Sequence, residues 1–296
     1  MRTLAFTLPI ATAVGCAPGN AAFQYESTLY DSTRGLVLQD ADTAQAGMVG
    51  NTCEVRVDSA GVGRDVDVAE SDDHVEDAFA GVVLVRGTSG LHLYQPAGYT
   101  GGGSPILPGD DVLGGALIDG GVVAVSGDNG NLRVSWTGDQ VTSQPIAGTQ
   151  FDGLTVDRTS GTAFVVSDGA IEAVGPDGTH SVDGGDFAAW DAAAEVLYVA
   201  DRGGHELRGV EADGGRRFAT PMDGDISAIG SLNGQAVVSI AGAGAGQLVF
   251  VDGFTGEVTD SEPTPGAADA LRSSPHGDTL AVVVDGQTHF FRDHRD

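Results

Sequence analysis

The sequence contains no lysine, only two cysteines and few aromatic side chains, and each scarcity excludes a class of protein. All 14 basic residues are arginine, against 42 aspartates and glutamates, so the formal net charge is −28. Such a surface repels phosphate backbones and anionic lipid head groups, and we expect no nucleic acid among the partners. Without lysine the chain has neither a P-loop nor Schiff-base chemistry. Adaptation to a saline habitat and a biased genome composition explain the acidity equally well.

Helical periodicity is missing as well. No helix-length segment places apolar residues at positions i, i+3, i+4 and i+7. Hydrophobic residues make up 41% of the chain, aromatic residues 6%, and 46 residues are glycine. The chain is long enough to bury a core, and this composition predicts an all-β protein whose core consists of small aliphatic side chains.

The first residues predict export. Arg2 precedes an apolar stretch, residues 4–14, that is too short to span a bilayer and is followed by small residues. This order is typical of a secretory signal peptide. We expect residues 1–15 to be the signal peptide, residues 16–22 a tether, and residues 23–296 a single domain.

Residues 13–16, Ala-Val-Gly-Cys, resemble the lipobox of bacterial lipoproteins, in which a small residue precedes a cysteine that receives the lipid anchor. The resemblance implies lipidation of Cys16, although Ala13 departs from the more usual leucine. Ala17 after it is similar to the class sorted to the outer membrane. The alternative is a plain cleaved signal peptide that leaves Cys16 as a free thiol. Cys53, in the alternating run TCEVRV, is predicted to be an inert core residue without a disulfide partner.

An aspartate followed by small apolar residues returns along the chain at intervals of 34 to 44 residues. After each copy come a turn, an apolar strand, a second turn, a third strand and a more polar fourth strand. This order, at about forty residues per unit, is typical of the blades of a β-propeller. The six copies are Asp77, Asp111, Asp152, Asp186, Asp225 and Asp269.

The two ends of the chain indicate how the ring closes. The last unit has only three strands, and the strand-like segment 23–31 belongs to no unit. If this N-terminal strand completes the last blade, no open edges remain. A less regular unit at 36–70 brings the total to seven four-stranded blades, within a range of six to eight.

The stretch LYVAD (197–201), preceded by AAWDAAAE (188–195), resembles the YVTN type of bacterial propeller repeat, a WD40-like architecture. Members of that group are mostly binding or scaffold proteins of the cell envelope, and some related propellers are hydrolases or lactonases. The resemblance implies a fold, and a fold alone does not identify an activity.

The repeated aspartate is predicted to open the innermost strand of each blade, so the six copies should form a ring near one mouth of the central channel. Such a ring could hold Ca²⁺ or another hard cation, which binds six to eight oxygen atoms. We favour a structural role instead, in which each carboxylate accepts hydrogen bonds from backbone N–H groups two residues further on. Six uncompensated charges in a narrow ring would also repel one another.

No other pattern has the spacing of a defined site. The acidic run 65–77 lacks the glycine and terminal glutamate of an EF-hand, the seven histidines lack zinc-ligand spacing, and no G-x-S-x-G element occurs. We therefore predict a non-catalytic binding or scaffold propeller of the cell envelope, without cofactor, held at the outer membrane through Cys16 and serving a protein or small-molecule ligand. The alternative is a metal-dependent hydrolase or lactonase.

Overall fold

The structure of the protein is a computed structural model. It describes residues 23–30, 45–48, 54–59, 62–67, 74–79, 82–87, 89–94, 106–108, 111–137, 142–175, 178–242, 245–274, 277, 279–285 and 287–293. The predicted signal peptide and tether, with Cys16, and also Cys53, lie outside the described residues. Among the residues described, there is no helix of the length and apolarity needed to cross a bilayer.

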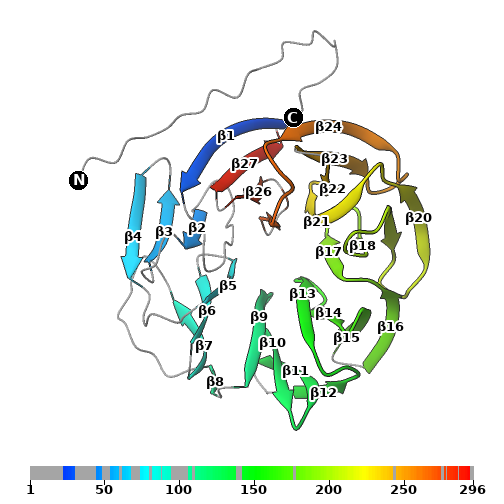
Figure 1. Cartoon of the computed structure of the whole chain (residues 1–296). Coiled ribbons are helices and arrows are strands. Elements are labelled where there is room, and N and C mark those ends of the chain that lie inside the picture. The colour runs from blue at the N-terminus through cyan, green and yellow to red at the C-terminus, as the bar shows by residue number, and fades with distance from the viewer. Residues whose placement is uncertain are drawn as a thin grey trace.

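The strands form seven antiparallel sheets arranged around a central axis, each with its strands stepping outward from the centre (Figure 1). The all-β prediction and the seven-bladed propeller are therefore confirmed. Six of the sheets have four strands. The first blade has three described strands, and the strand expected at 36–40 lies outside the described residues.

The blades follow one another along the chain. The first holds β2 (Gln45–Met48), β3 (Glu54–Ser59) and β4 (Val62–Asp67). The second holds β5 (His74–Phe79), β6 (Val82–Gly87), β7 (Gly90–Tyr94) and β8 (Leu107–Pro108). The third holds β9 (Val112–Ile118), β10 (Gly121–Asp128), β11 (Asn131–Thr137) and β12 (Thr142–Ile146). The fourth holds β13 (Phe151–Asp157), β14 (Thr162–Ser167), β15 (Ala170–Gly175) and β16 (Gly178–Gly184).

The remaining three blades complete the ring. The fifth holds β17 (Phe187–Asp191), β18 (Val196–Ala200), β19 (Glu206–Val210) and β20 (Arg216–Pro221). The sixth holds β21 (Asp225–Leu232), β22 (Gln235–Ala241), β23 (Gly246–Asp252) and β24 (Val258–Thr264). The seventh holds β25 (Ala270–Ser273), β26 (Thr279–Val284), β27 (Gln287–Asp293) and β1 (Phe23–Tyr30).

Burial changes from the second strand of a blade to the fourth. The second strands β18 and β26 are buried at every position, because both faces of a blade pack against neighbouring blades. The fourth strands β20 and β24 alternate between exposed and covered residues, since one face is open to water. The polar fourth strands that the sequence predicts at 141–147 and 216–221 are confirmed as β12 and β20.

Small residues line the first strands because the blades converge at the axis. A methyl group added at Gly114 would lie 2.8 Å from the ring of Phe151, and one at Gly115 would lie 2.9 Å from Leu91. Both distances are shorter than real contacts allow, so a side chain at either position would force Phe151 or Leu91 to shift in this close-packed interior. The same convergence explains the alanines of β17.

Hairpins within the blades turn through residues with positive φ. Asp168 and Gly169 have φ of 51° and 73°, and Asn233 and Gly234, in the hairpin before β22, have 45° and 80°. Aspartate or asparagine followed by glycine favours this turn, as the sequence predicts for 167–170.

The ring closes through the N-terminal strand. β1 pairs antiparallel with β27 over seven residue pairs, from Phe23 opposite Asp293 to Tyr30 opposite Gln287 (Figure 1). The seventh blade therefore combines strands from both ends of the chain, as the sequence predicts. This pairing covers the edge that β27 would otherwise expose.

We expect a chain that begins at residue 31 to be less stable than one that begins at residue 23. At a net gain of about 0.5 to 1.5 kcal/mol for each hydrogen bond, loss of β1 lowers the free energy of unfolding by about 3 kcal/mol or more. Thermal and urea unfolding of the two truncated chains measures the difference. Equal stability would show that β1 does not close the ring.

Candidate functional site: the central cavity

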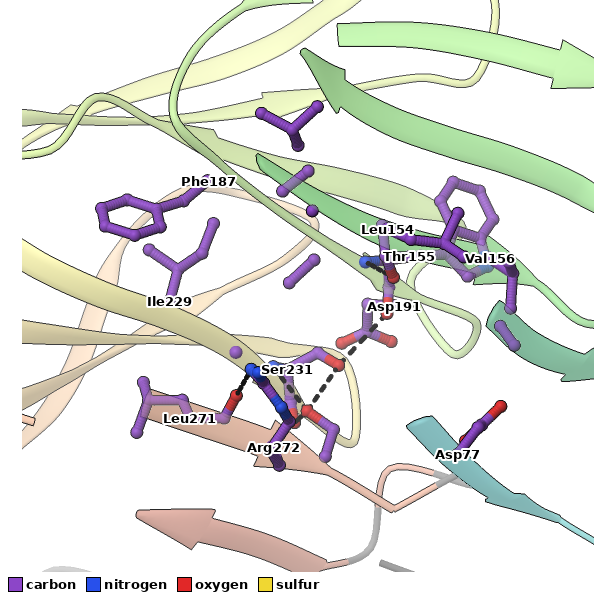
Figure 2. A pocket seen from close by; sticks show the side chains of 18 of the residues that line it. Asp77, Leu154, Thr155, Val156, Phe187, Asp191, Ile229, Ser231, Leu271 and Arg272 are labelled. Carbon is purple, nitrogen blue, oxygen red and sulfur yellow. Dashed lines mark hydrogen bonds between the residues drawn. The ribbon is translucent and has the colours of Figure 1, made fainter. Parts of the chain in front are cut away.

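A cavity of about 640 Å³ lies along the axis of the ring. It is lined by residues of the first strands β5, β9, β13, β17, β21 and β25 and of the turns at their ends. We call the end at which these strands begin the N-terminal mouth, and the end at which they finish the C-terminal mouth. Figure 2 shows side chains from several blades converging on this space.

An ion pair joins three blades near the C-terminal mouth. Arg158, directly after β13, donates from Nη1 to Oδ2 of Asp77 over 2.7 Å and from Nη2 to Oδ1 over 2.9 Å. The Leu117 N–H in β9 also donates to Oδ2 of Asp77, over 2.7 Å, and Arg158 donates to the Leu117 carbonyl. Because Asp77 belongs to β5, one two-pronged contact links the second, third and fourth blades.

Arg158 also lies over an aromatic ring. Its guanidinium carbon is 5.0 Å from the centre of the Phe79 ring, within the range of a cation–π contact. The side chains of Asp77 and Arg158 are 11% and 20% exposed. Their charges are thus largely removed from water and depend on each other.

A second carboxylate ties the fifth blade to the sixth. Asp191, at the end of β17, is buried and accepts four hydrogen bonds: from Ala193 N over 2.8 Å, from Ala194 N over 3.1 Å, from Tyr198 Oη over 3.2 Å, and from Gly234 N in the sixth blade over 3.0 Å. Burial raises the pKa of Asp191, and the four bonds oppose that rise. Burial, with the nearby charge of Asp191, also raises the pKa of Tyr198. The carboxylate therefore anchors the turn after β17 and one inter-blade contact.

Serine hydroxyls make further contacts between blades at the ends of the first strands. Ser231 donates from Oγ to the Trp190 carbonyl over 3.2 Å, and its N–H donates to Oγ of Ser273 over 2.9 Å. Ser273 in turn donates to the Ser231 carbonyl over 2.5 Å. The fifth, sixth and seventh blades are thus joined by two hydroxyl groups. Figure 2 shows Ser231 together with Asp191.

Two arginines of the lining make no ion pair among the described residues. Arg202 lies over Phe187, 4.6 Å from the ring centre, at the N-terminal mouth. Arg272 in β25 donates from Nη1 to the carbonyl of Leu271 over 3.0 Å (Figure 2). By contrast, Arg86, Arg158, Arg208 and Arg217 each form an ion pair.

The six repeated aspartates do not form one ring. Five lie where the first strands begin and are exposed: Asp111, Asp152, Asp186, Asp225 and Asp269. Of these, Asp152, Asp186 and Asp269 line the cavity. The predicted position of Asp77 is wrong, because Asp77 lies past the bulge of β5, is buried, and bonds to the far end of β9.

The structural role favoured for the repeated aspartates is present, but its partner differs from the prediction. Asp152 accepts a hydrogen bond from the N–H of Asp168 over 3.1 Å, and Asp186 accepts one from Arg202 N over 2.8 Å. In both blades the N–H donor belongs to a residue sixteen positions further on, in the turn between the second and third strands. The carboxylate thus fastens that turn to the start of the first strand.

The contact to the N–H group two residues on occurs at a different set of aspartates. Asp157 bonds to Thr159 N, Asp191 to Ala193 N, Asp213 to Gly215 N, and Asp252 to Phe254 N. These aspartates follow or end a strand, where an Asx turn starts the reversal of the chain.

The described residues contain no group of three or more histidine, cysteine, aspartate or glutamate side chains placed to hold a metal ion. The carboxylates at the N-terminal mouth come from separate blades, and Asp152 and Asp186 are engaged with backbone N–H groups. A calcium ion at the channel mouth stays a prediction.

Sequence reasoning missed several residues of the cavity, including Arg158, Asp191, Ser231 and Arg272. Of these residues, Arg272 could have been noticed in the sequence. The segments that open the first strands are small and apolar after their aspartate, and DALRS (269–273) alone places an arginine within the strand.

No known protein family matches the chain, and no curated protein gives a significant match. Among solved structures, a chain in a crystal structure of the mitotic checkpoint complex is 13% identical, with 99% of this chain and 98% of that chain covered and a TM-score of 0.64. BBS1N, crystallised in complex with ARL6DN and soaked with mercury, is 10% identical, with 93% and 97% covered and a TM-score of 0.65. At these identities the likeness shows the fold alone.

We expect Asp191→Asn to lower the free energy of unfolding by about 2 kcal/mol, because the amide nitrogen cannot accept a hydrogen bond from Gly234 N or Tyr198. The pKa of Asp191 is raised in the folded protein, so its proton is bound more tightly there than in the unfolded chain. The extra stability that comes from this tighter proton binding is therefore complete below the pKa of the unfolded chain. It is lost as the pH rises through the pKa of the folded protein.

The stability difference between the unmodified protein and Asp191→Asn should accordingly widen as the pH falls from 7 toward 4. The titration of the other carboxylates is common to both proteins and cancels in the difference. Thermal unfolding of the two proteins across this pH range measures the difference. A stability difference that narrows on acidification would contradict a raised pKa of Asp191.

Proposed function

We propose that the protein is a lipid-anchored, non-catalytic binding propeller of the cell envelope. The observation that carries the proposal is the closed ring around an axial cavity of about 640 Å³, a size typical of small-molecule sites. The cavity is open to loops at its two mouths, where a protein partner would bind.

The engagement of the cavity's polar groups supports binding over chemistry. Asp77 and Asp191 are held by an arginine and by backbone N–H groups, and the hydroxyls of Ser231 and Ser273 bond across blades. Groups committed to holding the ring are poor candidates for a nucleophile with its base.

A protein partner is the second element of the proposal. Both solved structures described above are of protein complexes, one a checkpoint complex and one of BBS1N with ARL6DN. With a net charge of −28, this chain would favour a partner that presents a basic face.

Anchoring through Cys16 is the third element. The lipobox-like residues 13–16 support it, and only six residues separate Cys16 from Phe23, where β1 begins. A lipid on Cys16 would tie the membrane almost directly to the strand that closes the ring. We place the protein at the outer membrane on the resemblance at Ala17.

We expect Cys16→Ser to move the protein from the membrane fraction to the soluble fraction. The thiol accepts the lipid, and a serine hydroxyl does not replace it, so the apolar chains that hold the protein are lost. Fractionation of cells that express each form, followed by immunoblotting, measures the change, with Cys53→Ser as the matched control. Unchanged membrane association of Cys16→Ser would refute the anchor.

The binding role is tested separately. Cross-linking in intact cells, followed by capture of the unmodified protein, should identify a partner whose cross-links map to the turns at one mouth. Cross-links spread evenly over the outer strands would contradict a role for the mouths.

A further inference from the structure

Arg272 is the one charged side chain of the first strands that points to a ligand. It is exposed to the water of the cavity, and its single hydrogen bond, over 3.0 Å, is to the carbonyl of its neighbour Leu271. A guanidinium has five N–H donors, so most of its donor capacity is unused within the described part of the chain. In a protein with three times as many acidic as basic residues, an arginine without a carboxylate partner needs an explanation.

Glu76, the carboxylate whose charge acts on Arg272, already has other partners. Glu76 raises the pKa of Arg272, but the larger effect is burial, which lowers it. Glu76 itself accepts a hydrogen bond from Arg86 Nε over 2.6 Å and one from Gly115 N over 3.4 Å. Arg272 is therefore closely surrounded by protein, lines the cavity, and makes no ion pair with Glu76 among the described contacts.

A guanidinium that lines a cavity and makes no ion pair is well suited to bind the carboxylate of a ligand. Arginine stays protonated when it is partly desolvated, and its planar fork matches the two oxygens of a carboxyl group. Ser231 and Ser273 also line the cavity, so its wall offers hydroxyl groups as well as Arg272.

The rest of the cavity restricts what else the ligand carries. Asp152, Asp186 and Asp269 line the N-terminal mouth, and Asp269 precedes Arg272 by three residues, or about 10 Å along a strand. These carboxylates repel a polyanion and attract a cationic group. The cavity thus offers Arg272 within, and at the mouth three carboxylates against the single arginine Arg202.

We propose that the axial cavity binds a small zwitterion, with its carboxylate on Arg272 and its amine or guanidine group toward the aspartates of the N-terminal mouth. The proposal rests on the binding function proposed above and names the ligand class of the same site. Free amino acids with a basic side chain and ω-amino acids have this chemistry.

The experiment compares matched ligands on the unmodified, purified protein. L-arginine and 4-aminobutanoate carry both charges, L-argininamide lacks the carboxylate, and citrate lacks the cation. Ligand excess over the dissociation constant raises the melting temperature, and we expect a rise of about 2 °C or more with at least one zwitterion and none with L-argininamide or citrate. Equal shifts with L-arginine and L-argininamide, or no shift with either zwitterion, would overturn the proposal.

Substitution then assigns the contact. In calorimetric titration, Arg272→Gln should lower the affinity for the zwitterion at least tenfold. Arg272→Lys should lower it less, because lysine keeps the positive charge, although it loses the planar fork of the guanidinium. Arg216→Gln, an equal change of charge on the exposed strand β20, is the control and should bind as the unmodified protein does. Undiminished binding to Arg272→Gln would refute the assignment. If that variant does not fold, the comparison of L-arginine with L-argininamide decides the proposal.

Failure here is distinguishable from failure of the proposed function. A partner captured at a channel mouth, together with no zwitterion binding, would leave the binding propeller standing and remove only the ligand class.

Discussion

The ring depends on hydrogen bonds and ion pairs that cross from one blade to the next close to the axis. Within a blade, strands satisfy their backbone groups by pairing, but the first strands of neighbouring blades belong to separate sheets. Their remaining N–H groups need other acceptors, since an unpaired buried donor is costly. Asp77 supplies one to Leu117 N of β9, and Asp191 accepts in the same way from Gly234 N in the turn that follows β21. Apolar clusters that span two blades, such as the one that includes Ala228 of the sixth blade and Leu271 of the seventh, also hold the blades together.

This use of carboxylates explains how so acidic a chain tolerates aspartate at its centre. Each inner carboxylate is matched to donors: Asp77 to a guanidinium, Asp191 to three backbone N–H groups and a phenol. The charges at the N-terminal mouth are instead exposed to water. The cavity therefore keeps a polar wall in which these two carboxylates are paired, and Arg272 is the lining arginine within a first strand that makes no ion pair among the described residues.

Much of the fold could be predicted from the sequence because its signals are local and repeated. Runs such as VLYVA (196–200) indicate buried strands, and glycine after aspartate or asparagine marks the hairpins. Even the closure between β1 and β27 could be predicted, since one end lacked a strand and the other had a spare one. The ion pair between Asp77 and Arg158 could not be predicted, because the two residues are 81 positions apart and no sequence pattern relates them. The register of Asp77 was missed for a related reason: in β5 the aspartate follows the bulge, whereas in β13 Asp152 lies at the bulge, and sequence spacing alone does not show this difference. Arg272 could have been found, since it interrupts a small apolar strand.

A double-mutant cycle on Asp77 and Arg158 tests most directly whether side chains across the blades hold the ring. Asp77→Asn, Arg158→Gln and the double variant would be compared with the unmodified protein by urea unfolding. We expect each single change to cost about 2 kcal/mol and the double variant to cost at least about 1 kcal/mol less than the sum, because either change alone leaves a charge without its partner. Losses that add within about 0.5 kcal/mol would show that the two side chains act independently and would contradict the account.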